Sequence, residues 1–278
     1  MNYFVSKITP FGVLVEPKKS GTNIEELDVE SLRKKFCEEQ LVLIRGFKTF
    51  GNSNSFSDYC HRWGEVSIWP FGKVLELIQK DKPEDHIFDN SYVPLHWDGM
   101  YRLQVPEFQI FHCVKAPLPG KGGRTTFSNT VMLLDNLSKE LKELWSSVIG
   151  TYKREMEFYN SKVVSPVITK HPYRDYFVIR YNEPHNPTKG ELINIPKLNF
   201  IGVEKSNLTE FHIDLNKALY NPQNFYAHEW RDGDVVIADN FSLLHGREAF
   251  EPNTPRHIQR VQVLSNPPYD NPNLESYQ

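Results

Sequence analysis

The chain has 278 residues, of which 39% are hydrophobic and 13% aromatic, and its formal net charge is −3. This composition is enough for a sizeable core, and we expect one domain over residues 1–278. Because lysines and arginines are scattered, the sequence excludes the basic patch typical of a nucleic-acid or anionic-membrane partner. It also has no signal peptide and no apolar run of about 18 residues, which predicts a cytoplasmic protein.

The cysteine pattern agrees with that compartment. Cys37, Cys60 and Cys113 are widely separated, odd in number and without C-x-x-C spacing. We therefore expect buried free thiols in a reducing environment. The composition leaves open whether the chain forms a homo-oligomer.

Strands alternate with helices in the first part of the chain. Residues 13–16 and 41–47 predict strands, the second a continuous apolar run that suits full burial. Between them, residues 23–39 have an apolar stripe with charged residues opposite, which predicts an amphipathic helix. A short helix is expected at residues 53–63.

Later segments repeat this mixture of elements, and the tail from about residue 266 is expected to be flexible. The predicted strands are 108–114, 176–181, 234–239 and 257–264, and the predicted helices are 129–148 and 208–219. Strands that enclose a pocket, with a few flanking helices, indicate a mainly β protein. The fold we predict is a double-stranded β-helix, the jelly-roll of cupin-like proteins.

An imidazole and a carboxylate stand two residues apart at His96 and Asp98. Side chains at positions i and i+2 of a strand share one face, so both can hold one ion while Trp97 faces the other way. A second histidine, His245, closes an isolated Leu-Leu-His-Gly far downstream. Two histidines and one carboxylate leave three coordination positions open, which is typical of non-haem Fe(II) oxygenases. We predict these three residues as metal ligands and catalytic centre.

The other histidines have simpler interpretations. His112 lies in the apolar segment FQIFHCV, where a lone histidine is more often a hydrogen-bonded core residue than a ligand. His257 follows Arg256 and therefore points to the opposite face of the predicted strand. Neither is expected to bind the metal.

Arginines follow the second histidine. A polar turn leads into a predicted strand that starts at Arg256 and also carries Arg260. An arginine fork holds a carboxylate bidentately and stays charged, so these residues suit an acidic ligand near the metal. The alternative, which also applies to Arg247, is a solvated charge or a partner for a nearby glutamate.

Several motifs follow one another along the chain: HWD at 96–98, GGRTTFS at 122–128, DVVIADN at 234–240, LLHG at 243–246 and the pair Arg256 and Arg260. In this order they resemble the TauD/TfdA-like 2-oxoglutarate dioxygenases, over most of the chain. The resemblance implies the jelly-roll fold, Fe(II) as the metal, and 2-oxoglutarate and O2 as cosubstrates. It implies that Arg256, eleven positions after the distal histidine, grips the distal carboxylate of 2-oxoglutarate. Thr125 would assist, and Arg260 would lie at the inner end of the same site.

Longer stretches such as VPLHWDGMY, VPEFQIFHC and LLHGREAFEPNTPRH resemble the PvcB-like branch, oxygenases of isonitrile biosynthesis that act on tyrosine isonitrile. This implies a small-molecule substrate, tyrosine isonitrile or a related acid, and desaturation with decarboxylation to a vinyl isonitrile in secondary metabolism. Such a pocket needs a cation, aromatic walls and a polar contact for the phenol. Tyr92, Tyr101, Arg180 and Arg260 are the candidates.

Three alternatives remain. The nearest is hydroxylation of another small carboxylic or sulfonic acid by a member of the same family. A zinc hydrolase could also use two histidines and a carboxylate, although no general-base carboxylate stands nearby in the sequence. A non-catalytic jelly-roll binding protein would need the fold but not the metal and cosubstrate residues together.

Overall fold

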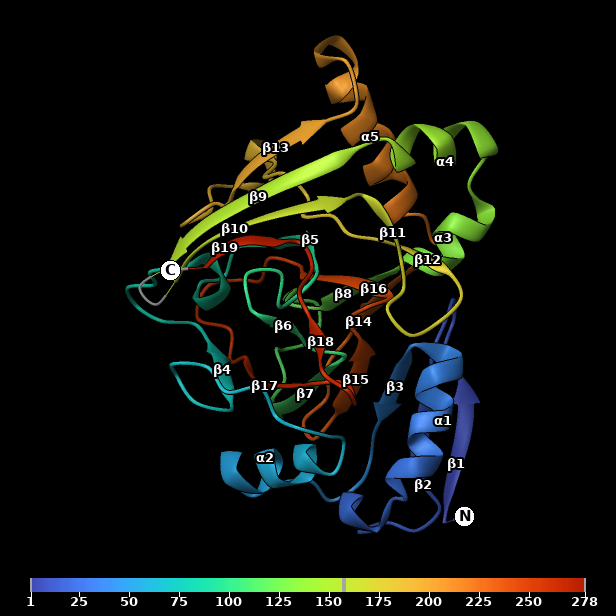
Figure 1. Ribbon diagram of the computed structural model, residues 1–278. Coiled ribbons are helices and arrows are strands. Elements are labelled where there is room, and N and C mark those ends of the chain that lie inside the picture. The colour runs from blue at the N-terminus through green and yellow to red at the C-terminus, as the bar shows by residue number, and fades with distance from the viewer. Residues whose placement is uncertain (1, 157–158, 278) are drawn as a thin grey trace.

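Two facing sheets form the centre of the protein in the computed structural model, which describes residues 2–156 and 159–277 (Figure 1). The major sheet has the strand order β1 (Tyr3–Lys7), β2 (Val13–Pro17), β3 (Leu41–Ile44), β15 (Val235–Asp239), β7 (Phe108–Lys115), β17 (His257–Val263) and β4 (Leu75–Ile78). The minor sheet has the order β14 (Phe225–His228), β8 (Thr125–Asn129), β16 (Leu243–Arg247) and β5 (Val93–His96). Apart from the parallel pair β2 and β3, the strands of both sheets pair antiparallel. The mainly β, jelly-roll prediction is confirmed.

Further strands lie beyond these sheets. The outer sheet has the order β13 (Lys197–Ile201), β9 (Ile149–Met156), β10 (Tyr159–Pro166) and β19 (Leu274–Tyr277). Two short pairs join β11 (Ile168–Lys170) to β12 (Phe177–Ile179) and β6 (Gln104–Val105) to β18 (Tyr269–Asp270). The α-helices are α1 (Val29–Glu39), α2 (Ser53–His61), α3 (Thr130–Asn136), α4 (Lys139–Ser146) and α5 (Leu208–Leu219). Single 3-10 turns occur at η1 (Ile24–Glu26), η2 (His86–Phe88), η3 (Pro187–Lys189) and η4 (Lys205–Asn207).

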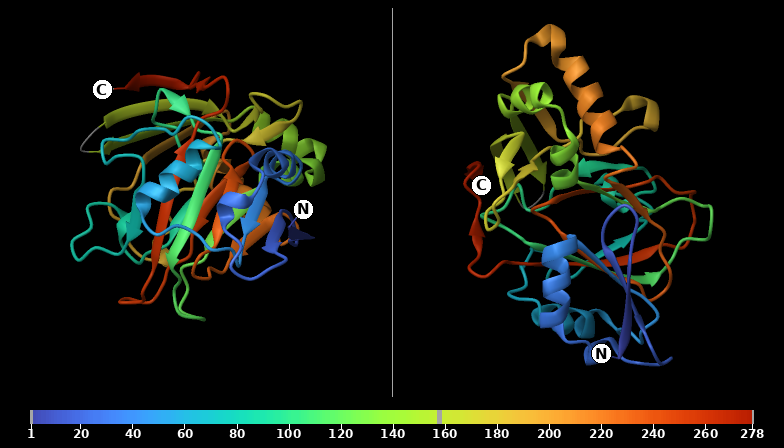
Figure 2. Two further views of the ribbon diagram at one scale, coloured as in Figure 1. Left: turned by 90° about the horizontal axis from the view of Figure 1, so that it is seen from below. Right: turned by 90° about the vertical axis from the view of Figure 1, so that its right-hand side faces the viewer.

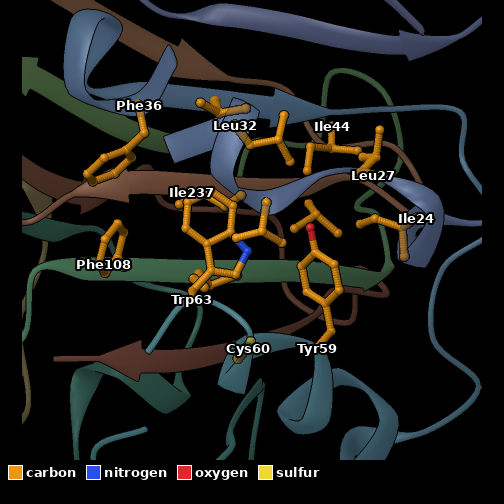
Figure 3. Close-up of a cluster of buried hydrophobic side chains, with 14 of the residues drawn as sticks. Ile24, Leu27, Leu32, Phe36, Ile44, Tyr59, Cys60, Trp63, Phe108 and Ile237 are labelled. Atoms are coloured by element: carbon orange, nitrogen blue, oxygen red, sulfur yellow. The ribbon is translucent and has the colours of Figure 1, made fainter. Parts of the chain in front are cut away.

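The central strands β3 and β15 of the major sheet are buried on both faces because they are apolar at successive positions. On β15, Val235 and Ile237 join the cluster beneath α1 and α2, whereas Val236 and Ala238 face the minor sheet. Figure 3 shows the helix-covered side, where Phe36 of α1 lies near Phe108 of β7. Burying a side chain of this size stabilises the fold by about 1.5–3 kcal/mol. The continuous apolar run predicted at residues 41–47 forms the fully buried strand β3.

The remaining helices cover the other end of the molecule. Figure 2 shows α1 and α2 at one end and α4, α5 and the outer sheet at the opposite end. A second apolar cluster there joins Leu244 of the minor sheet to Leu215 of α5 and Trp145 of α4. No helix of the described residues is long and apolar enough to cross a membrane.

Two predicted helices are each divided. The segment 23–39 forms η1 and then α1, because the Asp28 side chain accepts the backbone N–H of Ser31 and starts a new helix. The segment 129–148 forms α3 and α4, because Ser138 caps α4 by accepting from the Leu141 backbone. Capping side chains therefore interrupt an apolar spacing that continues across them.

Two other expectations differ from the structure. The tail from about residue 266, expected to be flexible, forms β18 and β19, which pair with β6 and β10. Tyr269 and Leu274 also pack against the second apolar cluster, which gives this segment a buried anchor. Among the cysteines, Cys60 and Cys113 are buried free thiols as predicted, whereas Cys37 is exposed.

Candidate metal centre and active site

The three predicted metal ligands meet between the two central sheets. His96 at the end of β5 is the direct cross-strand partner of His245 on β16, and their ring centroids lie 4.3 Å apart. The ligand atoms of His96, Asp98 and His245 all lie within 4.8 Å of one another. In the described part of the chain, this is the one group of histidine, cysteine and acidic side chains found at such spacing.

Asp98 reaches this group in a different way from the one we predicted. The strand β5 ends at His96, and Asp98 lies in the following turn. Asn240 holds that turn, since its Oδ1 accepts the Asp98 N–H at 2.8 Å and its Nδ2 donates to the Asp98 carbonyl at 2.9 Å. The same Nδ2 also donates to the Pro106 carbonyl at 2.9 Å. A side-chain amide thus replaces the missing strand pairing.

The carboxylate of Asp98 is held by the major sheet. Its Oδ2 accepts hydrogen bonds from Gln109 at 2.8 Å, Arg260 at 2.5 Å and Gln262 at 2.9 Å. Burial would raise the pKa of Asp98, but Arg260 and the two neighbouring histidines hold that pKa well below its usual range. Asp98 therefore carries its negative charge toward the histidines, with Oδ1 3.5 Å from His96 Nε2.

The histidines turn ring nitrogens toward Asp98. His96 Nδ1 lies 2.8 Å from the Pro94 carbonyl, to which it donates, and this bond turns Nε2 to the side of Asp98. Burial and the neighbouring His96 lower the pKa of His245 to about 3. Two neutral imidazoles and one carboxylate are the donors that Fe(II) accepts on one face, so the residues fit the metal.

A second polar region surrounds Arg256, which directly precedes β17. Arg256 is only 6% exposed, and burial together with the nearby Arg247 lowers its pKa to about 9. Its Nε donates to the Gly123 carbonyl at 3.1 Å, and no carboxylate of the described residues lies within ion-pair distance of it. Burying a cation without a counter-charge is costly, so this region favours an anion.

The glycine turn of GGRTTFS shapes this region. Gly123 has φ +77°, and a Cβ there would lie 3.2 Å from the Arg256 side chain. A Cβ on Gly122 would lie 2.2 Å from the Ala249 carbonyl oxygen, a clash that only a shift of the backbone could relieve. Gly123 therefore lets the turn pack directly on Arg256, and Gly122 lets it pack on the backbone of Ala249 and Phe250.

Thr125 follows that turn at the start of β8. It pairs with Arg247 of β16, two residues from His245, so it lies on the same face of the minor sheet as the histidine. Its Oγ1 accepts a hydrogen bond from Trp230 Nε1 at 3.0 Å. Because Oγ1 is used as an acceptor here, the hydroxyl hydrogen can be donated to an anion.

Arg247 has a structural role, but it is buried and is not the solvated charge or glutamate partner that the sequence suggested. Its guanidinium donates to the backbone carbonyls of residues 86, 87, 89 and 91. These bonds fix the segment that leads into β5. Arg256 is not held in this way, because the hydrogen bond of its Nε goes to the glycine turn alone.

A cavity of about 710 Å³ opens onto the metal ligands. Its lining includes His96, Asp98 and Arg260 at the inner end, and Tyr101 beside them. The rest of the wall combines aliphatic residues with aromatic rings and charged side chains, which include Trp69, Phe71, Phe88, Lys80, Glu84 and Arg154. Arg154 forms a buried ion pair with Asp85 on this wall. The cavity thus offers both apolar surface and charge to a small aromatic acid.

Two of the predicted substrate contacts lie outside the cavity lining. Arg180 is buried behind Trp97, with its guanidinium 4.7 Å from that ring and one nitrogen donating to the Asn240 carbonyl. Tyr92 uses its phenol to bond the segment at residues 185–186. The polar groups of both side chains bond other parts of the protein. Neither the residue type nor the position in the sequence reveals these bonds.

Other residues of the site were missed in the sequence. Gln109 and Gln262 are nearly fully buried on apolar strands and bond Asp98, and Asn240 holds its turn. A buried amide in an apolar strand needs a partner, and that was the available signal. His112 is a core residue as predicted, 3.0 Å from Gln259, and His257 instead bonds Glu76.

Comparison with known proteins agrees with this geometry. The sequence model of "Taurine catabolism dioxygenase TauD, TfdA family" matches residues 5–262. The chain belongs to this family. The tyrosine isonitrile desaturase of Pseudomonas aeruginosa is 44% identical over 265 residues, covering 95% of this TauD/TfdA protein and 91% of that one.

Two further relatives extend the comparison. A 3-((Z)-2-isocyanoethenyl)-1H-indole synthase of Fischerella ambigua is 39% identical over 270 residues, covering 94% of this chain and 96% of that protein. The solved structure of PvcB, described as an Fe, alpha-ketoglutarate dependent oxygenase from an isonitrile synthetic pathway, matches with a TM-score of 0.86. Its sequence identity is 40%, with 99% of this chain and 97% of that chain covered. This TauD/TfdA protein is therefore an enzyme of a dioxygenase family.

Proposed function

We propose that this chain is an Fe(II)- and 2-oxoglutarate-dependent oxygenase that converts tyrosine isonitrile to a vinyl isonitrile with loss of the substrate carboxylate. The observation that carries the proposal is the group of His96, Asp98 and His245, whose ligand atoms lie within 4.8 Å of one another and of which His96 and Asp98 line a cavity of about 710 Å³. The 44% identity to a tyrosine isonitrile desaturase supports this substrate class.

In this proposal the two histidines and Asp98 hold Fe(II). When bound, the iron together with 2-oxoglutarate and O2 supplies the oxidising power for removing a hydrogen from the substrate. The protein keeps His245 neutral by burial and keeps Asp98 charged through Arg260. The hydrogen bond from His96 to the Pro94 carbonyl fixes the ring, so that Nε2 faces the metal position.

Arg256 and Thr125 hold the cosubstrate. The buried guanidinium of Arg256 supplies the charge for the distal carboxylate of 2-oxoglutarate, and the Thr125 hydroxyl donates a further hydrogen bond. Arg260 lies at the boundary between this site and the cavity, because it both bonds Asp98 and lines the cavity. It adds positive charge where acidic ligands meet the metal.

The substrate occupies the cavity with its benzylic carbon toward the inner end. Tyr101, Trp69 and Phe88 provide walls for the aromatic ring. Arg260 and Arg154 provide positive charge for the carboxylate. We place the enzyme in the cytoplasm, because free cysteines suit a reducing compartment.

The proposed reaction balances. Tyrosine isonitrile loses a benzylic hydrogen and its carboxylate as CO2, which gives up two electrons and forms the side-chain double bond. 2-Oxoglutarate gives up two more electrons as it becomes succinate and CO2. Together they reduce one O2, whose atoms end in succinate and in water.

The test measures succinate and product with tyrosine isonitrile, tryptophan isonitrile, free tyrosine and taurine as substrates. We expect tyrosine isonitrile to stimulate succinate formation most, and mass spectrometry to show a product that has lost CO2. Free tyrosine should not stimulate turnover, because its ammonium would be desolvated in an apolar pocket. A product that gains oxygen would indicate hydroxylation instead, and equal turnover of taurine would contradict the substrate assignment.

A further inference from the structure

Trp69 stands on the cavity wall in a closed turn. The backbone groups of Trp69 and Gly72 bond each other in both directions, at 3.0 and 2.8 Å. The Arg102 guanidinium lies 4.4 Å from the Trp69 ring, and Phe71 stacks on the ring with an interplanar angle of 12°. The indole is therefore held in one position although it is only half-buried.

The indole is also bonded toward the metal centre. Trp69 Nε1 donates to Gln262 Oε1 at 2.9 Å, and Gln262 Nε2 donates to Asp98 Oδ2 at 2.9 Å. The backbone follows the same path, since the Ser67 N–H donates to the Gln262 carbonyl at 2.9 Å. Two hydrogen bonds thus connect a residue of the cavity wall to a predicted metal ligand.

The direction of this chain of bonds is fixed by chemistry. An indole N–H can only donate and an ionised carboxylate can only accept. Gln262 therefore has to turn its oxygen toward Trp69 and its amino group toward Asp98. Removing the indole N–H leaves the amide oxygen without its donor and loosens the group that holds Asp98.

We propose that Trp69 and Gln262 are positioning residues that brace Asp98 and couple the substrate wall to the metal centre. A ligand that contacts and shifts the Trp69 ring would then shift the hydrogen bonds that orient the metal-binding carboxylate of Asp98. The coupling part of this inference rests on the proposed function. The bracing part does not, because it concerns the geometry of Asp98 alone.

The first experiment measures Mn(II) affinity by titration, with no substrate or cosubstrate present. Loss of a hydrogen-bond partner of a ligand typically weakens metal binding about 10- to 100-fold, which we expect for Gln262→Leu. Trp69→Phe keeps a ring but removes the N–H, and we expect a loss of about 2- to 10-fold. The matched controls are Gln223→Leu, at an exposed glutamine, and Phe177→Leu, at an exposed ring of β12 outside the cavity lining.

Both controls should bind Mn(II) within about twofold of the unaltered protein, since neither touches Asp98. If Gln262→Leu unfolds, Gln262→Met keeps a side chain of similar length but lacks the N–H that bonds Asp98, so weaker binding is again expected. Unchanged Mn(II) affinity in a folded Gln262 variant and in Trp69→Phe would overturn the brace.

The second experiment follows the visible absorption of the anaerobic Fe(II)–2-oxoglutarate complex. Tyrosine isonitrile should shift this band in the unaltered protein and in Phe177→Leu, but not in Trp69→Phe. Trp69→Phe should also form succinate in excess over product. A normal shift in Trp69→Phe would overturn the coupling. If no protein responds to tyrosine isonitrile while the Mn(II) affinities follow the prediction, the substrate assignment fails and the brace stands.

Discussion

The metal end of the cavity and its outer wall are built in different ways. His96, His245 and the residues that bond Asp98 come from paired strands, whose backbone bonds fix alternate side chains. The outer wall comes mainly from turns and loops, at residues 69–71, 84–88 and 192–196. Reactive groups thus stand on rigid elements, whereas the surfaces that select the substrate stand on segments that tolerate change. The same metal end can therefore serve many substrates in one family.

The largest effects should come from the metal end. His96→Ala or His245→Ala removes one of two nitrogen ligands, so we expect loss of iron binding and of turnover with the fold intact. Iron titration, succinate formation and circular dichroism measure these properties. His61→Ala, at an exposed histidine, is the matched control and should change none of them. Full oxygenase activity in both ligand variants would contradict the assignment.

The cosubstrate site should respond next. Arg256→Ala removes a charge-assisted bidentate contact worth about 2–4 kcal/mol, so the KM for 2-oxoglutarate should rise about 30- to 1000-fold. Thr125→Val should raise the same KM more mildly, because it removes one neutral donor.

Arg124→Ala is the control for this site. Arg124 adjoins Thr125 in the sequence but pairs with Glu248 at the surface. Its loss should leave the KM for 2-oxoglutarate unchanged, as for most exposed ion pairs. If Arg256→Ala behaved like this control, another cation, Arg260 or Arg247, would have to hold the cosubstrate.

The difference between the strands of the metal end and the loops of the outer wall also explains what could be predicted from the sequence. The strands of the two sheets follow from alternating or continuous apolar runs, and the grouping of His96, Asp98 and His245 follows from their spacing and resemblance. The amides around Asp98 were missed, because their role depends on which strands become neighbours. Gln109 and Gln262 are 153 positions apart in the chain yet are direct cross-strand partners.

The outer wall was harder to predict for a physical reason. Loop side chains have no fixed period, so spacing does not show which of them face a cavity. Arg180 and Tyr92 matched the chemistry that a substrate needs, but they are bonded to other groups in the structure. Trp69 and Arg154 reach the cavity through tertiary contacts made far along the chain.

A smaller effect should separate the cavity wall from the metal end. Tyr101 lines the cavity, and Tyr101→Phe should raise the KM for the substrate about 2- to 10-fold, the range of one hydrogen bond. The KM for 2-oxoglutarate should stay unchanged. Tyr173→Phe, at a tyrosine that bonds the Pro267 carbonyl at the surface, is the control. Equal changes in both KM values would mean that Tyr101 acts on the metal end.

The pH dependence of stability depends on groups outside the metal centre as well as on His245. Burial lowers the pKa of His112, His171 and His228 from the usual value of 6.5. Below about pH 6.5 these histidines bind protons in the unfolded chain but stay neutral in the folded protein. The free energy of unfolding therefore falls as pH falls. Each such group contributes at most about 1.4 kcal/mol per pH unit. Urea unfolding of chelator-treated protein at pH 7.5, 6.5 and 5.5 should show this decline.

Glu107 should act in the opposite direction and make the smallest change. Burial and the nearby Asp239 raise the pKa of Glu107 to about 7, from a usual value of 4.5. Its stabilising contribution is present below pH 4.5 and is lost as pH rises through 7, so between these values it offsets one of the histidines. Glu107→Gln removes the offset, and its stability should fall more steeply between pH 7 and 5 than that of the unaltered protein, by about 1 kcal/mol per pH unit at most. Parallel unfolding curves would show that Glu107 stays ionised, held by the Arg174 guanidinium 3.5 Å away.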